Sequence, residues 1–265
     1  MDFSDASKNG MEYASHLAKA LKASLTLLYV RMSIWPEAVQ LEKEMTDSNE
    51  AIQERLSLFA TEVLEEFRIH CDYFIEQTTN TFEEAVASRA EEYDMVVMGT
   101  NGVDNLYQYV FGTNTFHVIE KSKCPVLIIP IGCSYKTISK MIYAYDPDTN
   151  PIFLIDQLKK FVSSLDIGIK VLHIAEENPS LEIIQKMEIL RNAVKARKLK
   201  NISWSFDFQY STDVPWALSQ YMKINGGDIL SLSFHQRSLI ERLFTENVIK
   251  QISMIADYPV YIFWR

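Results

Sequence analysis

The sequence predicts an α/β protein made of two tandem, doubly wound domains with parallel sheets. Apolar strand-like runs alternate along the chain with segments whose apolar residues recur at helical spacing, and such alternation produces parallel sheets covered by helices on both faces. In addition, residues 93–130 resemble residues 227–264 at a constant offset of 134, with Asp94 matching Asp228 and Pro125 matching Pro259. Self-similarity of that length indicates a duplicated domain.

In the first half, the elements follow from local patterns. The stretch 7–23 carries its apolar residues on one helical stripe, and Thr81 followed three positions later by Glu84 is typical of a capping box at a helix start. The helices are expected at 7–23, 47–67, 81–92 and 116–119, and the strands at 24–30, 70–77, 95–98 and 126–129.

The second half repeats this order. Strands are expected at 140–145, 169–174, 202–210, 229–232 and 260–263, and helices at 151–164, 180–198, 214–224 and 245–255. The junction is expected between Ile131 and Thr137, where Gly132 and Ser134 interrupt the strand-like residues. The predicted domains therefore cover residues 1–133 and 138–265, each with its ligand site at the carboxyl ends of the strands.

Three glycines lie between the apolar run 95–98 and the helix-like segment that begins at 116. The pattern is Gly99-x2-Gly102-x9-Gly112-Thr113. Glycine lets backbone N–H groups approach a phosphate closely, and a helix N-terminus adds unpaired donors and a positive dipole. The pattern predicts a site for the phosphates of a nucleotide, and the alternative is three unrelated turn glycines.

The composition argues against several other classes of partner. A formal charge of −9 gives no general attraction for nucleic acid or an anionic membrane, so we expect neither as a partner. No apolar run approaches the roughly 20 residues needed to span a bilayer, and the first residues lack the basic and apolar regions of a signal peptide. The three cysteines lack the spacing of metal or redox sites, and their odd number agrees with a reducing compartment. We therefore expect a cytoplasmic protein.

Several segments together resemble the universal stress protein family. They are the start Asp2-Phe-Ser-Asp with the small-residue-rich helix after it, the run Leu25 to Val30, the glycine segment from Asp94 to Asn114, and the run Cys124 to Ile129. The resemblance covers the chain as a tandem pair. It implies domains of the adenine-nucleotide α-hydrolase-like type that bind ATP, ADP or AMP, with Mg²⁺ accompanying the triphosphate, and a regulatory role in stress response.

The resemblance also implies a set of nucleotide-binding residues, which lie at the start of the chain, at the end of the second strand and along the glycine loop: Asp2, Val30, Gly99, Gly102, Gly112, Thr113 and Asn114. In the family arrangement Asp2 faces the adenine or ribose and Val30 the adenine, while the loop residues border the ribose and hold the phosphates. Simpler roles stay open at this point, since Asp2 and Thr113 could each cap a helix and Val30 could be ordinary core.

The start of the chain departs from the family pattern. Family members carry an apolar strand before the aspartate, whereas here Met1 precedes Asp2 directly; the second half has such a strand, 138–145, before Asp146. The missing strand would be central, and its loss would leave unpaired backbone on both neighbours. We expect that an upstream start was overlooked or that the chain was cut, and the alternative is a rearranged first domain.

The glycine pattern is eroded in the second half. At the offset of 134, Ser233, Gln236, Glu246 and Asn247 stand where the first half has Gly99, Gly102, Gly112 and Thr113. Side chains thus replace hydrogens at the positions of close approach, and a carboxylate lies where a phosphate would sit. We expect the second domain not to bind ATP in the family manner.

The leading functional hypothesis is a nucleotide-binding regulatory protein with one working site. The sequence contains no P-loop, no nucleophile elbow and no two-histidine metal spacing, so we predict no catalytic or metal-ligating residues, although slow ATP hydrolysis stays open. A nucleotide-free interaction scaffold is the other alternative. The last strands of the two domains, 126–129 and 260–263, are expected to pair in antiparallel fashion, and a homodimer is left open.

Overall fold

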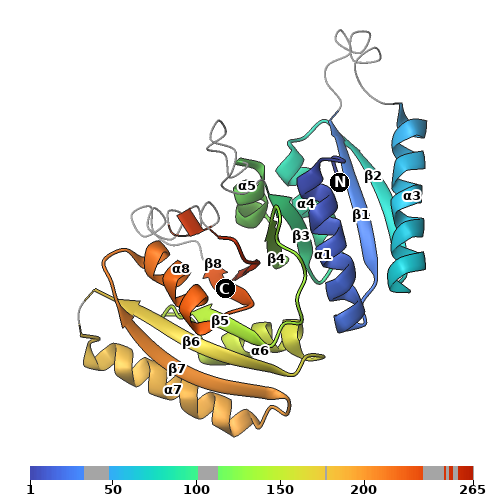
Figure 1. Cartoon of the computed structure of the whole chain (residues 1–265). Helices are drawn as coiled ribbons and strands as arrows, with labels where there is room; N and C mark the ends of the chain where they lie inside the picture. Colours follow the sequence, from blue (N-terminus) through green and yellow to red (C-terminus); the bar gives the residue numbers. More distant parts are fainter. Residues whose placement is uncertain are drawn as a thin grey trace.

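The protein is an α/β structure in which the two halves of the chain lie next to each other (Figure 1). The computed structural model describes residues 1–32, 48–100, 113–176, 178–234, 248, 251–252 and 256–264, and for residues 113 and 114 it describes the backbone only. None of the described helices is long and apolar enough to cross a membrane.

The first half alternates helices and strands as the sequence predicts. Its elements are α1 (Asp5–Leu21), β1 (Leu25–Met32), α3 (Asn49–Phe67), β2 (Cys71–Thr78), α4 (Phe82–Ala90), β3 (Val96–Thr100), α5 (Thr113–Lys121) and β4 (Val126–Pro130). Ser4 caps α1, because its side chain accepts a hydrogen bond from the N–H of Ser7. The capping box at α4 is present, with the Glu84 carboxylate accepting from the N–H of Thr81.

The second half follows the same order. Its elements are β5 (Lys140–Ala144), α6 (Pro151–Val162), β6 (Ile167–Ala175), α7 (Leu181–Arg197), β7 (Ile202–Tyr210), α8 (Val214–Asn225), β8 (Ile229–Phe234) and β9 (Val260–Trp264). Asn150, Ser180 and Asp213 cap the starts of α6, α7 and α8. Gly226 ends α8 with a φ of 62°, a left-handed conformation that glycine adopts without strain. The helix expected at 245–255 falls largely outside the described residues.

The strands form two sheets. A seven-stranded sheet runs through both halves in the order β3-β4-β9-β8-β5-β6-β7, and β1 and β2 form a separate parallel pair. All described pairings are parallel except β4 with β9, where Leu127 lies opposite Tyr261. The last strands of the two halves, which the sequence analysis expects to pair, are therefore hydrogen-bonded neighbours.

The split between the sheets corrects the expectation of one sheet per domain. In the second half, β5 lies between β6 and β8, whereas in the first half no described strand lies between β1 and β3, the counterparts of β6 and β8. Four strands of the first half are therefore divided into two pairs. The helices α1 and α4 lie beside this division (Figure 1).

The two halves share their apolar core. Alternate residues of β4 and β9 point to opposite faces of the sheet, so Leu127 and Tyr261 enter one buried cluster and Ile128 and Ile262 another. Both clusters also contain residues of helices from the two halves, such as Leu17 of α1. Burying each of these large side chains stabilises the fold by roughly 1.5–3 kcal/mol, so the halves stabilise one another.

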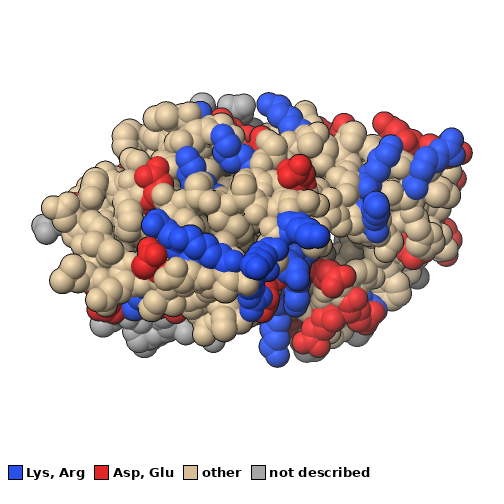
Figure 2. Space-filling model, turned by 90° about the horizontal axis from the view of Figure 1, so that it is seen from below, with Lys and Arg blue, Asp and Glu red and all other residues tan. Residues whose placement is uncertain are grey.

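Charged side chains are distributed in relation to the helix ends. Basic residues occupy the last turns of α1, α6 and α7, where positive charge interacts favourably with the helix dipole. Figure 2 shows Lys and Arg across the middle of the face seen from below, with Asp and Glu beside them.

Candidate functional site

The structure describes part of the predicted nucleotide site. Asp2 lies directly before α1, Val30 near the end of β1 and Gly99 near the end of β3, while Thr113 and Asn114 begin α5. Gly102 and Gly112 lie outside the described residues, as does the loop that contains them. The described part of the predicted site therefore consists of the turn before α1, the ends of β1 and β3, and the start of α5.

Asp2 makes a tight turn ahead of α1. Its Oδ1 accepts hydrogen bonds from the backbone N–H of Ser4 at 3.0 Å and from the Ser4 hydroxyl at 2.6 Å. Phe3 between them has a φ of 63°, so the backbone turns sharply there. Burial raises the pKa of Asp2, but hydrogen bonds from Ser4 and Ser7 outweigh it and lower the pKa overall. Since Ser4 is the helix cap, Asp2 is not, and the simpler role considered for it is wrong.

A backbone hydrogen bond positions this turn beside β1. The amino group of Met1 donates to the carbonyl of Leu28. In the second half the N–H of Tyr145 donates to the carbonyl of Leu172 in the same way, at 2.7 Å. Asp2 therefore occupies the place in the first half that Asp146 occupies in the second.

Val30 faces an apolar cluster. It is partly buried and packs, together with Leu28 and Met98, against a cluster that includes Val86 and Phe116. Its side chain thus lies with residues from β3, α4 and α5. This environment fits both roles considered for Val30, the floor of a ligand site and ordinary core.

Gly99 is in close contact with α1. A Cβ atom at this position would lie 1.9 Å from the carbonyl oxygen of Ala6, far inside any real contact. Gly10, on the same helix, would place a Cβ 2.9 Å from the backbone nitrogen of Gly99. Two glycines therefore let α1 rest directly on β3. The strand also continues through Gly99 to Thr100, two residues beyond its expected end at residue 98.

Thr100 is a polar residue at this edge that the sequence analysis did not select. Its side chain is buried, and its hydroxyl has no hydrogen-bond partner among the residues that the structure describes. It ends β3, directly after Gly99 and before the glycine loop. The sequence contains one signal that could have identified Thr100, which is its position directly after Gly99. A hydroxyl at the end of this strand can contact a ligand that binds there.

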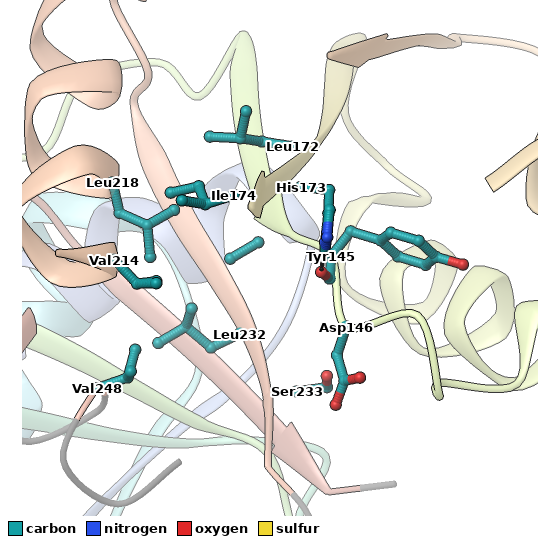
Figure 3. A pocket seen from close by; sticks show the side chains of 11 residues that line it. Tyr145, Asp146, Leu172, His173, Ile174, Val214, Leu218, Leu232, Ser233 and Val248 are labelled. Carbon is teal, nitrogen blue, oxygen red and sulfur yellow. Dashed lines mark hydrogen bonds between the residues drawn. The ribbon is translucent and has the colours of Figure 1, made fainter. Parts of the chain in front are cut away.

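A cavity of about 220 Å³ lies in the second half at the corresponding strand ends. It is lined by Val248 and by side chains from three strands, from α8 and from the loop after β5 (Figure 3): Ala144, Tyr145, Asp146, Leu172, His173, Ile174, Val214, Leu218, Leu232 and Ser233. Asp146, Ile174 and Ser233 are the counterparts of Asp2, Val30 and Gly99. The sequence analysis missed this cavity because it judged the second half only by the lost glycines.

Ser233 replaces the first glycine with a hydrogen-bonded side chain. Its hydroxyl lies 3.1 Å from the hydroxyl of Tyr143 and 3.3 Å from that of Thr149, and all three groups are buried. Burial raises the pKa of Tyr143 to about 12, so its hydroxyl keeps its proton at neutral pH. The edge of the second half is thus built from a hydroxyl network, whereas in the first half the backbone of α1 packs against Gly99.

Metal and thiol chemistry are not indicated in the described part of the chain. No group of three or more His, Cys, Asp or Glu residues there is arranged to hold a metal ion. The three cysteines are free. Burial raises the pKa of Cys71 and of Cys124 to about 11, which keeps both thiols protonated.

Comparison with protein families finds a match in the first half of the chain. Residues 1–130 match the model of the Universal stress protein family, and the first half of the chain therefore belongs to that family. The matched residues include Asp2, Val30 and the whole glycine pattern. None of the curated proteins compared with the chain matches it.

Solved structures extend the similarity of fold to the second half. A universal stress protein from Archaeoglobus fulgidus superposes with a TM-score of 0.77 at 15% identity, covering 100% of this chain and 96% of its own. A putative universal stress protein from Pseudomonas aeruginosa gives a TM-score of 0.57 at 11% identity, covering 91% and 92%. A functionally unknown protein from the same species gives 0.56 at 12% identity, covering 93% and 94%. The predicted fold class is therefore confirmed.

Proposed function

We propose that the protein is a regulatory protein of the stress response that binds one adenine nucleotide per chain, at the strand ends of its first half. The supporting observation is that the turn of Asp2 is hydrogen-bonded to β1, that Val30 near the end of β1 packs with Met98 of β3, and that α5 begins just after the glycine loop. Membership of residues 1–130 in the universal stress protein family supports the same ligand.

Each part of this edge has a chemical role in the proposal. The carboxylate of Asp2 accepts hydrogen bonds from ribose hydroxyls, and Val30 with Met98 offers an apolar surface to the adenine. The glycine loop and the first turn of α5, with Thr113 and Asn114, supply backbone N–H donors and the positive end of a helix dipole to the phosphates. Mg²⁺ would accompany a triphosphate through its phosphate oxygens.

Isothermal titration tests the proposal. ATP with Mg²⁺ and ADP should each bind with a stoichiometry of one. Gly112→Glu should weaken binding by several-fold to a hundredfold, or about 1–3 kcal/mol, because it removes donors and adds a negative charge. The matched control is Glu246→Gln at the corresponding position of the second half, which should leave the affinity unchanged. Two equivalent sites per chain, or an undiminished affinity in Gly112→Glu, would contradict the proposal.

Two alternatives to nucleotide regulation give different results. A nucleotide-free scaffold would release no adenine nucleotide when the purified protein is denatured and analysed by mass spectrometry, and it would give no titration signal. A slow ATPase would produce ADP at a rate that disappears in Gly112→Glu. We expect copurified nucleotide and no turnover above background.

A further inference from the structure

The strand β7 ends the seven-stranded sheet on the side of the second half (Figure 1). It has nine residues and pairs with β6 in an unbroken register from Ile202 to Tyr210, without a bulge. Among the described strands, none pairs with its other side. A long and regular edge strand offers its unpaired backbone groups to another chain, and proteins usually shorten, bend or charge such edges.

Two hydrogen bonds show which backbone groups of β7 point away from β6. At its start, the carbonyl of Asn201 accepts from the N–H of Ile167 at 3.0 Å. At its end, the N–H of Ser211 donates to the carbonyl of Ala175 at 2.9 Å. Since alternate residues of a strand direct their backbone groups to opposite sides, the odd-numbered residues bond to β6. The even-numbered residues direct their N–H and C=O groups to the open edge: Ile202, Trp204, Phe206, Phe208 and Tyr210.

Charged side chains protect the corresponding edge of the first half. On β2, Asp72 is exposed, and Glu76 forms an ion pair with Arg89 of α4 at 2.7 Å. On β7, Asp207 is the single charged residue, and it accepts hydrogen bonds from the hydroxyl of Tyr221 and from the next backbone N–H along the strand. Lysine and proline, which often protect an edge, are absent from β7. The edge of β7 is therefore less protected than that of β2.

We infer that β7 is a dimerisation edge, which pairs in antiparallel fashion with β7 of a second copy of this chain about a two-fold axis at Phe206. The N–H and C=O of Phe206 both point outward, so this residue and its copy can exchange two hydrogen bonds. A nine-residue strand gives a contact about 30 Å long, along which the sheet continues from one molecule into the other.

The apolar side chains of β7 match their own copies in this register. Residues at equal distances from Phe206 lie opposite each other, so Trp204 faces the partner's Phe208 and Ile202 faces the partner's Tyr210. Tyr210 is 58% exposed in the single chain, and the pairing covers it. Aromatic and branched side chains placed opposite each other stabilise an antiparallel pair.

The polar face of the strand is also compatible with a second copy. Ser203, Ser205 and Gln209 are exposed on this face. About the same axis, Ser205 lies opposite the partner's Asp207, and Ser203 opposite the partner's Gln209. The two carboxylates of the dimer therefore do not face each other, and like-charge repulsion is avoided.

The helix beside the edge adds complementary charge. The guanidinium carbon of Arg191 in α7 lies 5.0 Å from the ring centre of Phe206, so Arg191 is close to the axis. Glu188, which pairs with Arg191 at 3.3 Å, and Lys195 lie one turn to either side of it on the same stripe of the helix. The two-fold axis brings Glu188 of each chain toward the partner's Lys195.

Sedimentation equilibrium and hydrogen exchange of the unchanged protein test the inference. The chain of 30.6 kDa should form a dimer within the range of about 1–100 µM, as expected for a small interface. In the dimer, the N–H groups of Trp204, Phe206 and Tyr210 should exchange more slowly, because they then have partners. A monomer at every concentration, or added protection confined to β1, β2 or β3, would overturn the inference.

Three substitutions at exposed positions test the register. Ser205→Asp places a carboxylate opposite the partner's Asp207 and should weaken the dimer at least tenfold, whereas Ser205→Lys should not weaken it. The matched control is Gln77→Asp on β2, which adds the same charge and should leave association unchanged. Equal weakening by both changes at Ser205, or none by Ser205→Asp, would contradict the pairing. All three variants should bind ATP like the unchanged protein, so the result does not depend on the proposed nucleotide site.

Discussion

In the two halves of the molecule, the corresponding strands β3 and β8 are packed against different elements. In the second half, β5 lies between β6 and β8, and the Ser233 hydroxyl links β8 to Tyr143 of β5. In the first half, no described strand lies between β1 and β3, and α1 rests on β3 through Gly10 and Gly99. A glycine that predicts a phosphate site in the sequence is thus a packing residue in the structure, and at the corresponding position of the second half Ser233 forms hydrogen bonds instead.

The largest expected effect comes from making the first half resemble the second at this position. Gly99→Ser would place a Cβ atom 1.9 Å from the carbonyl oxygen of Ala6, so α1 must move away from β3. Overpacking typically costs 1–3 kcal/mol, and because the obstacle here is backbone we expect about 3 kcal/mol or more. Urea unfolding measures the loss, and hydrogen exchange should show it in α1. A urea midpoint equal to that of the unchanged protein would show that the packing of α1 on β3 tolerates a side chain at position 99.

The reciprocal test concerns the hydroxyl network of the second half. Ser233→Ala leaves the buried Tyr143 hydroxyl without this partner, which we expect to cost about 1–3 kcal/mol in free energy of unfolding. Adding Tyr143→Phe should recover part of the loss, because both polar groups are then absent. A double-mutant cycle in urea measures the coupling between the residues. Strictly additive losses would indicate that the pair contributes nothing beyond its individual side chains.

A smaller effect is expected where α1 holds the segment between the halves. The amide of Asn9 donates to the carbonyls of Pro130 at 3.2 Å and Cys133 at 3.4 Å. Asn9→Ala should lower the free energy of unfolding by about 1 kcal/mol. Asn80→Ala, a change of the same kind in the loop before α4, is the control and should cost less. Thermal unfolding compares the two, and equal losses would argue against a role of Asn9 in joining the halves.

The smallest effect is a pH dependence at Asp2. Its folded-state pKa is lowered, so the carboxylate contributes stability that is present above its unfolded pKa of about 3.9 and is lost as pH falls through the folded value. Asp2→Asn should therefore be less stable than the unchanged protein at pH 7, by less than about 1 kcal/mol because the residue is exposed, and the difference should be smaller at about pH 3, below the unfolded pKa. Melting temperatures at both pH values test this. A difference that grows in acid would contradict the assigned direction.

Local patterns predict most of the elements, because helical stripes, caps and short apolar runs are properties of neighbouring residues. The capping box of Thr81 and Glu84 at the start of α4 is an example. The pairing of β4 with β9 could also be predicted, because the repeat and its apolar last strands are visible in the sequence.

The contacts between distant elements could not be predicted in this way. Nothing in the sequence near Gly99 indicates that Ala6 lies against it, since that contact depends on how α1 sits relative to β3. The cavity of the second half was missed for a related reason, because the walls formed by Leu172 and Leu218 belong to segments far apart in the chain. The nucleotide-binding roles of Gly102 and Gly112 stay predictions, because both residues lie outside the described part of the chain.

The antiparallel contact of β4 with β9 has a consequence for assembly. An antiparallel pair of equivalent strands is the contact that two identical subunits make about a two-fold axis, and here β4 and β9, the last strands of the two halves, make this kind of contact within one chain. The connecting segment between β4 and β5 is short, and such a tether holds its partners at an effective concentration in the millimolar range. The contact therefore forms at any dilution of the protein, and its two edges are already occupied within a single molecule.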